Sequence, residues 1–301
     1  MKYKLAHVLE YAGVRAICGL LVALPHRVAL ALVWGPVRLA FLLNGRLRAR
    51  TRRRIRQALG TELPDREIAR IAWLAFRNLA FTVVEGLRLP GINPAWVARH
   101  IDLTPVEEVR AELVQTRGLI VAVPHMGNWE LAGIALHSQG VNLITLVRKQ
   151  KNPLMNAWIN RVRSQSGVET IDTHSRVVGE IAQKLNAGNR ILAVLPDVRA
   201  KTGGVSVRYL GVETEVPAGV AHYAREAQVP VITAEVVRTG WSRFNWRKTG
   251  FIVSDPDLNK EQDRRRIMQY VMDRFGESVR AHPENYFWFN KRWVLGAENG
   301  P

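Results

Sequence analysis

The stretch that decides the fold is "LIVAVPHMGNWELAGIALHSQG", residues 119–140. Its first five residues are all apolar, and a short apolar run of this kind is typical of a strand buried on both faces. Gly127 and Asn128 then open a helical pattern that ends at Gly140, where glycine commonly terminates a helix. His125 lies where the strand gives way to the helix. The stretch therefore predicts a strand–loop–helix unit with a histidine in its loop.

The same alternation continues along the chain. We predict strands at 119–123, 141–147, 191–195, 205–210, 229–237 and 251–255, and helices at 65–87, 127–140, 177–189, 219–228 and 261–283. Such alternation implies an α/β fold, with a mostly parallel central sheet flanked by helices. Ligand sites in these folds lie at the carboxyl ends of strands. Since His125 and Asp197 each follow a predicted strand end, we expect them to share a site.

The composition narrows the class of partner. The chain has 301 residues, of which 47% are hydrophobic, so it can bury a substantial core. Its net charge of +17 favours an anionic partner, namely nucleic acid, an anionic membrane surface or a phosphorylated substrate. Cys18 is the one cysteine. It can form neither an internal disulfide nor a zinc cage, so a reducing compartment is the default expectation.

The first sixty residues have a character of their own. Residues 12–43 are apolar, but arginines and prolines divide them into uncharged runs of only ten or eleven residues. A spanning helix needs roughly 17–25 apolar residues, so we expect two short helices in the membrane interface, with a tilted span as the alternative. Seven arginines follow within residues 46–56, suited to anionic lipid head groups. The chain contains no zinc-finger or RNA-recognition motif, which disfavours nucleic acid. We therefore predict a membrane-association segment at 1–60 and a catalytic domain at 61–301.

His125 is the strongest candidate for chemistry. The free N–H groups at the start of the following helix, near Gly127 and Asn128, could stabilise negative charge beside it. Either Glu130 or Asp197 could orient the imidazole, and we favour Asp197 because it comes from a neighbouring strand end. No nucleophile motif accompanies the histidine, so the expected chemistry is a general base that activates a substrate hydroxyl. The alternative is a loop histidine that merely caps the helix.

Basic residues cluster beyond the second strand of this unit. The stretch 146–167 carries Arg148 and Arg163 among other cations. Arginine suits phosphate recognition, so a substrate clamp is one interpretation and a solvated helix face is the other. No phosphate-binding glycine loop, dinucleotide fingerprint or zinc-protease motif occurs, so we expect no bound cofactor and no metal.

Four ordered blocks resemble a known family. They are "HMGNWE", "VRKQKNPLMNAWINRVRSQSG", "LPDVRAKTGGVSVRYLG" and "PENYFWFNKRW". Together they resemble the lipid A late acyltransferases, the lauroyl and myristoyl transferases of the lysophospholipid acyltransferase superfamily. The pattern is also similar to that of phosphatidylinositol mannoside acyltransferases. Two positions depart from it, because Asn290 stands where a histidine is common and the "PDVRAKTGG" stretch lacks a second acidic residue.

The resemblance implies a function. It implies transfer of a fatty acyl chain from acyl carrier protein or coenzyme A to a hydroxyl of a glycolipid or lipid A precursor. It also implies an enzyme at the cytoplasmic face of the bacterial inner membrane, peripheral or monotopic. His125 matches the catalytic histidine, Glu130 the acidic residue of the H-x4-D/E motif, and Asp197 an acidic position that pairs with the histidine in some members. Arg148 and Arg163 match basic positions near the donor and acceptor sites. Two rival hypotheses are a non-catalytic lipid-binding or lipid-transfer protein and a basic nucleic-acid-binding protein.

Overall fold

The computed structural model describes residues 3–147, 149–165, 167–172 and 177–296. Its centre is a six-stranded sheet with the order β3-β2-β4-β1-β7-β8. The strands are β1 (Gly118–Ala122), β2 (Asn142–Val147), β3 (Val168–Asp172), β4 (Arg190–Val194), β7 (Val231–Arg238) and β8 (Phe244–Ile252). Only β8 runs antiparallel to its neighbour. The predicted α/β fold with a mostly parallel sheet is confirmed.

β1 lies in the interior of the sheet and is buried along its whole length. Leu119 and Val121 belong to the apolar cluster on one face, whereas Ile120 and Ala122 belong to the cluster on the other. This two-sided burial explains why the strand is a continuous apolar run rather than an alternating one. Because the strand itself is apolar, the polar residues of the strand–loop–helix unit lie in the loop that follows it.

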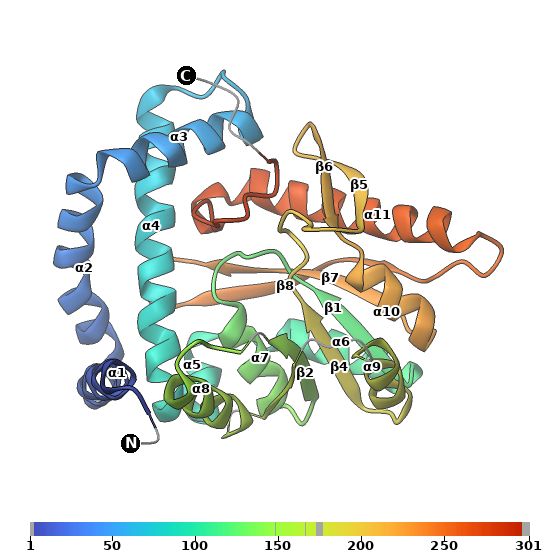
Figure 1. The fold of residues 1–301 in the computed structure, drawn as a ribbon, viewed down its shortest axis with the longest axis horizontal. Helices are drawn as coiled ribbons and strands as arrows, with labels where there is room; N and C mark the ends of the chain where they lie inside the picture. Colours follow the sequence, from blue (N-terminus) through green and yellow to red (C-terminus); the bar gives the residue numbers. More distant parts are fainter. Residues whose placement is uncertain (1–2, 148, 166, 173–176, 297–301) are drawn as a thin grey trace.

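Helices cover both faces of the sheet (Figure 1). The face of Leu119 packs against α5 (Pro94–His100), α6 (Thr104–Gln115), α7 (Trp129–Ser138) and α8 (Pro153–Gln165). The face of Ile120 packs against α9 (Val177–Asn186), α10 (Gly219–Ala227) and α11 (Lys260–Ala281). A separate hairpin of β5 (Gly204–Tyr209) and β6 (Val212–Pro217) lies on α11.

Three N-terminal helices, α1 (Leu5–Ala23), α2 (His26–Leu43) and α3 (Gly45–Leu59), pack on one long helix, α4 (Asp65–Arg88). In Figure 1, α4 stands between α1 and α2 on one side and the sheet on the other. Short 3-10 turns follow, η1 (Leu89–Gly91) directly after α4 and η2 (Pro283–Asn285) near the C-terminus. η2 packs against α4 as well, so this helix touches both ends of the chain.

α1 and α2 are longer than the short helices expected from the sequence. They have 19 and 18 residues, and by length and composition each could cross a membrane. Only 11% and 22% of their most apolar windows are buried, so they are not core helices. Arg15 and Pro36 lie inside the helices without ending them, and the break comes at Leu24 and Pro25. Two exposed apolar helices are consistent with membrane association.

Two details of the predicted strands are wrong. The strand expected at 251–255 is the end of β8, which begins at Phe244 and alternates buried and exposed residues at first. β3 and β6 were not predicted. Their sequences, "VETID" and "VETEVP", carry charged residues at exposed positions and therefore lack an apolar run.

Candidate active site

His125 and Asp197 meet at the carboxyl edge of the sheet. β1 and β4 pair in parallel, and Val123 N–H continues the pairing by donating to Val194 O at 3.1 Å. The loops that follow the two strands therefore begin side by side. His125 Nδ1 lies 2.7 Å from Asp197 Oδ1, and the His125 backbone N–H donates to Oδ2 at 2.9 Å. The hydrogen bond expected between these two residues is thus present.

The Asp197 carboxylate sets the state of the imidazole. Asp197 is buried, and a carboxylate on Nδ1 leaves Nε2 of the neutral ring as the proton acceptor. Burial lowers the pKa of His125, but the charge and hydrogen bond of Asp197 outweigh it and raise the pKa above its ordinary value. None of the described residues hydrogen-bonds to Nε2, and the side chain keeps 22% of its surface exposed. The ring can therefore accept a proton from a molecule outside.

Aromatic residues from β5 and from the C-terminal segment lie near the pair. Phe287 N–H donates to His125 O at 2.8 Å, and its ring lies 6.1 Å from the imidazole. Tyr209 and Tyr286 are buried near Asp197, and burial together with neighbouring charge raises the pKa of each phenol. Both phenols therefore stay protonated beside the carboxylate. Neither tyrosine is predicted from the sequence as a site residue, although Tyr209 falls within the "LPDVRAKTGGVSVRYLG" block and Tyr286 within the "PENYFWFNKRW" block.

The partner of Glu130 is an arginine of the neighbouring helix. Glu130 is the second residue of α7, and its carboxylate accepts a hydrogen bond from Arg163 of α8 at 2.6 Å. The two residues are among those that line a pocket of about 220 Å³ between α4, α7 and α8. The rest of the lining is apolar, including Leu87 and Trp158. Arg163 thus lines this pocket with a carboxylate as its partner, whereas Arg148 lies outside the described residues.

Gly127 and Asn128 are held by the protein itself. Gly127 has φ of +58°, and an added Cβ would lie 2.0 Å from Val236 O, so the position requires glycine. Its N–H donates to Asn285 O at 3.0 Å, and its carbonyl accepts from Thr82 at 3.0 Å. The Asn128 side chain caps α7 through Leu131 N–H. The predicted oxyanion role of these N–H groups stays a prediction, and at Gly127 it competes with the bond to Asn285.

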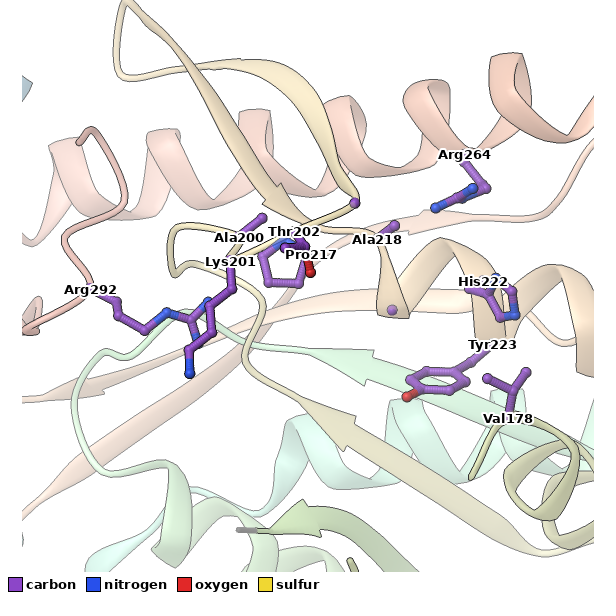
Figure 2. A pocket seen from close by; sticks show the side chains of 12 residues that line it. Val178, Ala200, Lys201, Thr202, Pro217, Ala218, His222, Tyr223, Arg264 and Arg292 are labelled. Atoms are coloured by element: carbon purple, nitrogen blue, oxygen red, sulfur yellow. The ribbon is translucent and has the colours of Figure 1, made fainter. Parts of the chain in front are cut away.

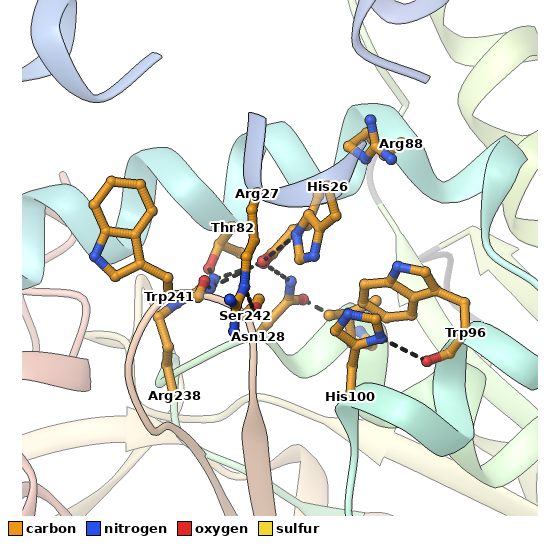
Figure 3. A network of polar contacts seen from close by, with 12 residues as sticks. His26, Arg27, Thr82, Arg88, Trp96, His100, Asn128, Arg238, Trp241 and Ser242 are labelled. Carbon is orange, nitrogen blue, oxygen red and sulfur yellow. Dashed lines mark hydrogen bonds and ion pairs between the residues drawn. The ribbon is translucent and has the colours of Figure 1, made fainter. Parts of the chain in front are cut away.

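A buried ion pair contacts Asn128, and Figure 3 shows the polar contacts around Asn128, Arg238 and His26. Glu85 of α4 binds Arg238 of β7 through both carboxylate oxygens, at 2.5 and 2.9 Å, and both side chains are fully or almost fully buried. Glu85 also accepts from Asn128 Nδ2 at 2.7 Å and contacts His26 Nε2 of α2 at 3.2 Å. Burial raises the pKa of Glu85, but the charge of Arg238 and the hydrogen-bond donors outweigh this effect. The net pKa lies below its ordinary value, so the carboxylate is ionised.

This cluster, which we call the Glu85 network, also contacts the C-terminal segment that packs against the His125 loop. Arg238 N–H donates to Asn285 Oδ1 at 2.8 Å, and Asn285 is the residue that holds Gly127. Asn78 of α4 donates to Glu284 O at 2.8 Å in the same segment. The Glu85 network therefore fixes both the His125 loop and the C-terminal segment against it. In the described part of the chain, no group of three or more His, Cys, Asp or Glu residues could hold a metal ion.

The fold and site define an α/β protein with a His–Asp pair at the carboxyl edge of its sheet and an apolar pocket nearby. Residues 2–294 match the sequence profile described as bacterial lipid A biosynthesis acyltransferase, and the chain belongs to this family. The resemblance inferred from the four sequence blocks is confirmed.

Curated relatives agree with this assignment. The chain is 26% identical over 214 residues to a phosphatidylinositol mannoside acyltransferase of Mycobacterium tuberculosis, covering 70% of this chain and 66% of that protein. It is 23% identical over 213 residues to the protein of the same name from Mycolicibacterium smegmatis, covering 70% and 68%. The aligned part of the chain thus spans 66% of the length of the first relative.

Proposed function

We propose that the protein is a membrane-associated O-acyltransferase. It moves a fatty acyl chain from a thioester donor, acyl carrier protein or coenzyme A, to a hydroxyl of a membrane glycolipid. The observation that carries the proposal is the His125–Asp197 pair, which leaves Nε2 open to a substrate. Membership of the lipid A acyltransferase family and similarity to phosphatidylinositol mannoside acyltransferases support a glycolipid acceptor.

The proposed reaction uses this geometry. Nε2 of His125 accepts the proton of the acceptor hydroxyl while Asp197 stabilises the imidazolium that forms. The hydroxyl oxygen attacks the thioester carbonyl and forms the new ester bond. The carbon–sulfur bond breaks, and the thiolate takes the proton back from Nε2. Atoms and charges balance with no covalent enzyme intermediate.

The apolar pocket between α4 and α8 suits the acyl chain. Its lining buries methylene groups, each worth about 0.8 kcal/mol when removed from water. Val83 lines this pocket and is 56% exposed at the surface of α4. α4 also carries the N-terminal helices, so a chain can reach the pocket from the membrane side.

The N-terminal helices support membrane docking. Their large exposed apolar residues are Leu5, Val8, Leu9, Ile17, Leu20, Val28, Leu32, Trp34, Leu39, Leu42 and Leu43. The arginines of α3 follow directly and suit anionic lipid head groups. We place the protein on the cytoplasmic face of the bacterial inner membrane, where acyl carrier protein and coenzyme A thioesters are made.

The test is acyl transfer by purified protein in detergent, with a phosphatidylinositol mannoside and a lipid A precursor as acceptors. Mass spectrometry identifies the product, and a mass increase of one acyl chain on the glycolipid is expected. His125→Ala should lower the rate by roughly 10²–10⁴-fold with little change in thermal stability. Near-wild-type turnover in this variant would overturn the mechanism, and acyl-lipid binding without turnover by the wild type would favour the lipid-binding alternative.

A further inference from the structure

A row of aromatic rings leads from the N-terminal helix α2 to the proposed general base. In the order of their contacts, the rings of this aromatic row are Trp34, Trp73, Phe41, Phe76, Phe289 and Phe287. Neighbouring ring centroids lie 5.3–6.1 Å apart, within the usual range for paired aromatic side chains. The last ring, that of Phe287, lies 6.1 Å from the imidazole of His125. The aromatic row therefore ends at the active site.

The aromatic row is partly accessible from outside. Phe41 and Phe289 are buried and belong to the core. Phe76 and Phe287 are only partly buried, and Trp34 is 38% exposed. The buried rings hold the row in place, whereas the partly exposed rings present apolar surface along it.

α4 continues this apolar surface. One face of the helix carries five apolar residues at helical spacing, all partly or fully exposed, namely Trp73, Phe76, Ala80, Val83 and Leu87. From the first to the last of them the helix rises by about 21 Å. This face is long enough for more than one hydrocarbon chain to lie against it.

The His125 loop meets α4 between the two ends of this face. Thr82 of α4 donates to Gly127 O at 3.0 Å. Val83, the next residue, lines the apolar pocket proposed for the acyl chain of the donor. Phe76, six residues before Thr82, belongs to the aromatic row. The face thus leads to the acyl pocket on one side of the contact with the loop and to the aromatic row on the other.

A different kind of surface lines the cavity of about 380 Å³ that Figure 2 shows. Its lining includes the polar or charged side chains of Lys201, His222 and Arg264. Of the described residues that line it, none belongs to the aromatic row or to the apolar face of α4. The aromatic row is therefore better suited than this cavity to a hydrocarbon chain.

We propose that the aromatic row binds a hydrocarbon chain of the acceptor glycolipid while the apolar pocket holds the acyl chain of the donor. The inference rests on the proposed function, because it assumes a glycolipid acceptor. Trp34 is one of the large exposed apolar residues of α2, so the row is continuous with the surface suited to the membrane. An acceptor can therefore pass from the bilayer to His125 with its chain along apolar side chains.

The experiment compares Phe76→Ser with the control Phe251→Ser. Phe251 is 40% exposed on β8, where Lys248 lies over its ring, and it is not a member of the row. A second variant, Ala80→Gln, places a polar amide on the same face of α4 without removing a packed ring. Each protein is assayed with one acyl coenzyme A and two acceptors. These are a dihexanoyl phosphatidylinositol mannoside, which dissolves as a monomer, and the same head group without its acyl chains.

Phe76→Ser should raise KM for the dihexanoyl lipid by at least about tenfold, or about 1.4 kcal/mol. Ala80→Gln should raise it by at least about threefold. In both variants kcat at saturating lipid, and kcat/KM for the deacylated head group, should stay within about twofold of wild type. The control should match wild type with both acceptors.

Three results would overturn the proposal. The first is an unchanged KM for the lipid in both row variants. The second is an equal loss with both acceptors or a fall in kcat alone, because the row would then only support the His125 loop. The third is weaker binding to vesicles at unchanged KM, because the row would then contact the bilayer rather than the acceptor.

A failure of the proposed function is separable from a failure of this inference. If the wild type acylates neither acceptor, the proposed function fails for this substrate. Calorimetric titration of the dihexanoyl lipid then tests the aromatic row by itself. Binding that is kept in Phe251→Ser and weakened in Phe76→Ser supports the row, whereas equal binding by all the proteins, or none by the wild type, refutes it.

Discussion

The Glu85 network allows a prediction whose magnitude follows from burial. Glu85→Gln keeps the shape of the side chain but removes its charge and places an amide group against donors from Arg238 and Asn128. Arg238 is then a buried cation without a counter-charge, because both side chains of the pair are 0–1% exposed. Breaking a buried pair in this way costs about 3–5 kcal/mol. That is a large part of the roughly 5–15 kcal/mol that stabilises a typical folded domain.

Removing the Glu85 charge should also affect the active site. The Asn128 side chain loses its carboxylate acceptor, and Asn128 caps α7, which begins four residues after His125. We therefore expect kcat to fall by at least about tenfold, or 1.4 kcal/mol, with a smaller change in KM. The assays are chemical denaturation in detergent and steady-state acyl transfer on the fraction that remains folded.

The pH dependence of stability gives an independent check. The folded-state pKa of Glu85 lies below its ordinary value, so its stabilisation is fully present above the unfolded pKa of about 4.3. This stabilisation is lost as pH falls through the lower folded pKa. In Glu85→Gln the part of the fall in unfolding free energy at acidic pH that protonation of Glu85 causes should be missing.

Glu235→Gln is the matched control. Glu235 lies three residues before Arg238 on β7, and its side chain is 3% exposed, but its partner Arg247 is 67% exposed. Arg247 can return to water, so we expect a loss within about 1 kcal/mol. If Glu85→Gln destabilises no more than Glu235→Gln and keeps its kcat, the Glu85 network does not hold the His125 loop.

Two further predictions concern the carboxylates of the site. Asp197→Asn removes the charge that raises the pKa of His125, so the acid limb of the kcat/KM profile should move to lower pH while the maximal rate falls. The wild type loses its neutral base as pH drops through a pKa above the usual value of about 6.5, and an unmoved acid limb in the variant would argue against this pairing. Glu130→Gln and Arg163→Met should each lower kcat/KM. In the double variant the two losses should sum to less than their total, with a coupling energy of about 0.5–3 kcal/mol. Strictly additive losses would show that the 2.6 Å contact between the two side chains is without consequence.

The His125–Asp197 contact could be predicted because it follows from topology. An apolar run marks a buried strand, parallel strands end at the same edge, and both residues stand just past such ends. Glu130 could not be placed by the same reasoning. Its five-residue spacing from His125 looks local, but the intervening loop ends at Asn128, and the second position of α7 faces α8.

The Glu85–Arg238 pair joins residues 153 positions apart, and no local pattern links them. The sequence does contain a signal for the Glu85 side of this pair. Asn78, Thr82 and Glu85 recur at helical spacing within the apolar pattern of α4, and all three are buried. Buried polar residues need partners, so this stripe predicts polar groups on the facing segments. Their identities depend on tertiary packing that the helix sequence does not encode.

The same stripe bears on the boundary expected at residue 60. A membrane anchor that only tethers a catalytic domain would leave that domain's polar core complete by itself. Here His26 at the start of α2 contacts Glu85, and Cys18 of α1 hydrogen-bonds to Leu87 O at the end of α4. Leu30 of α2 is fully buried in a cluster with Phe81 of α4. Since α4 holds the His125 loop through Thr82 and Glu85, the helices suited to the membrane and the residues suited to catalysis share one helix as their support.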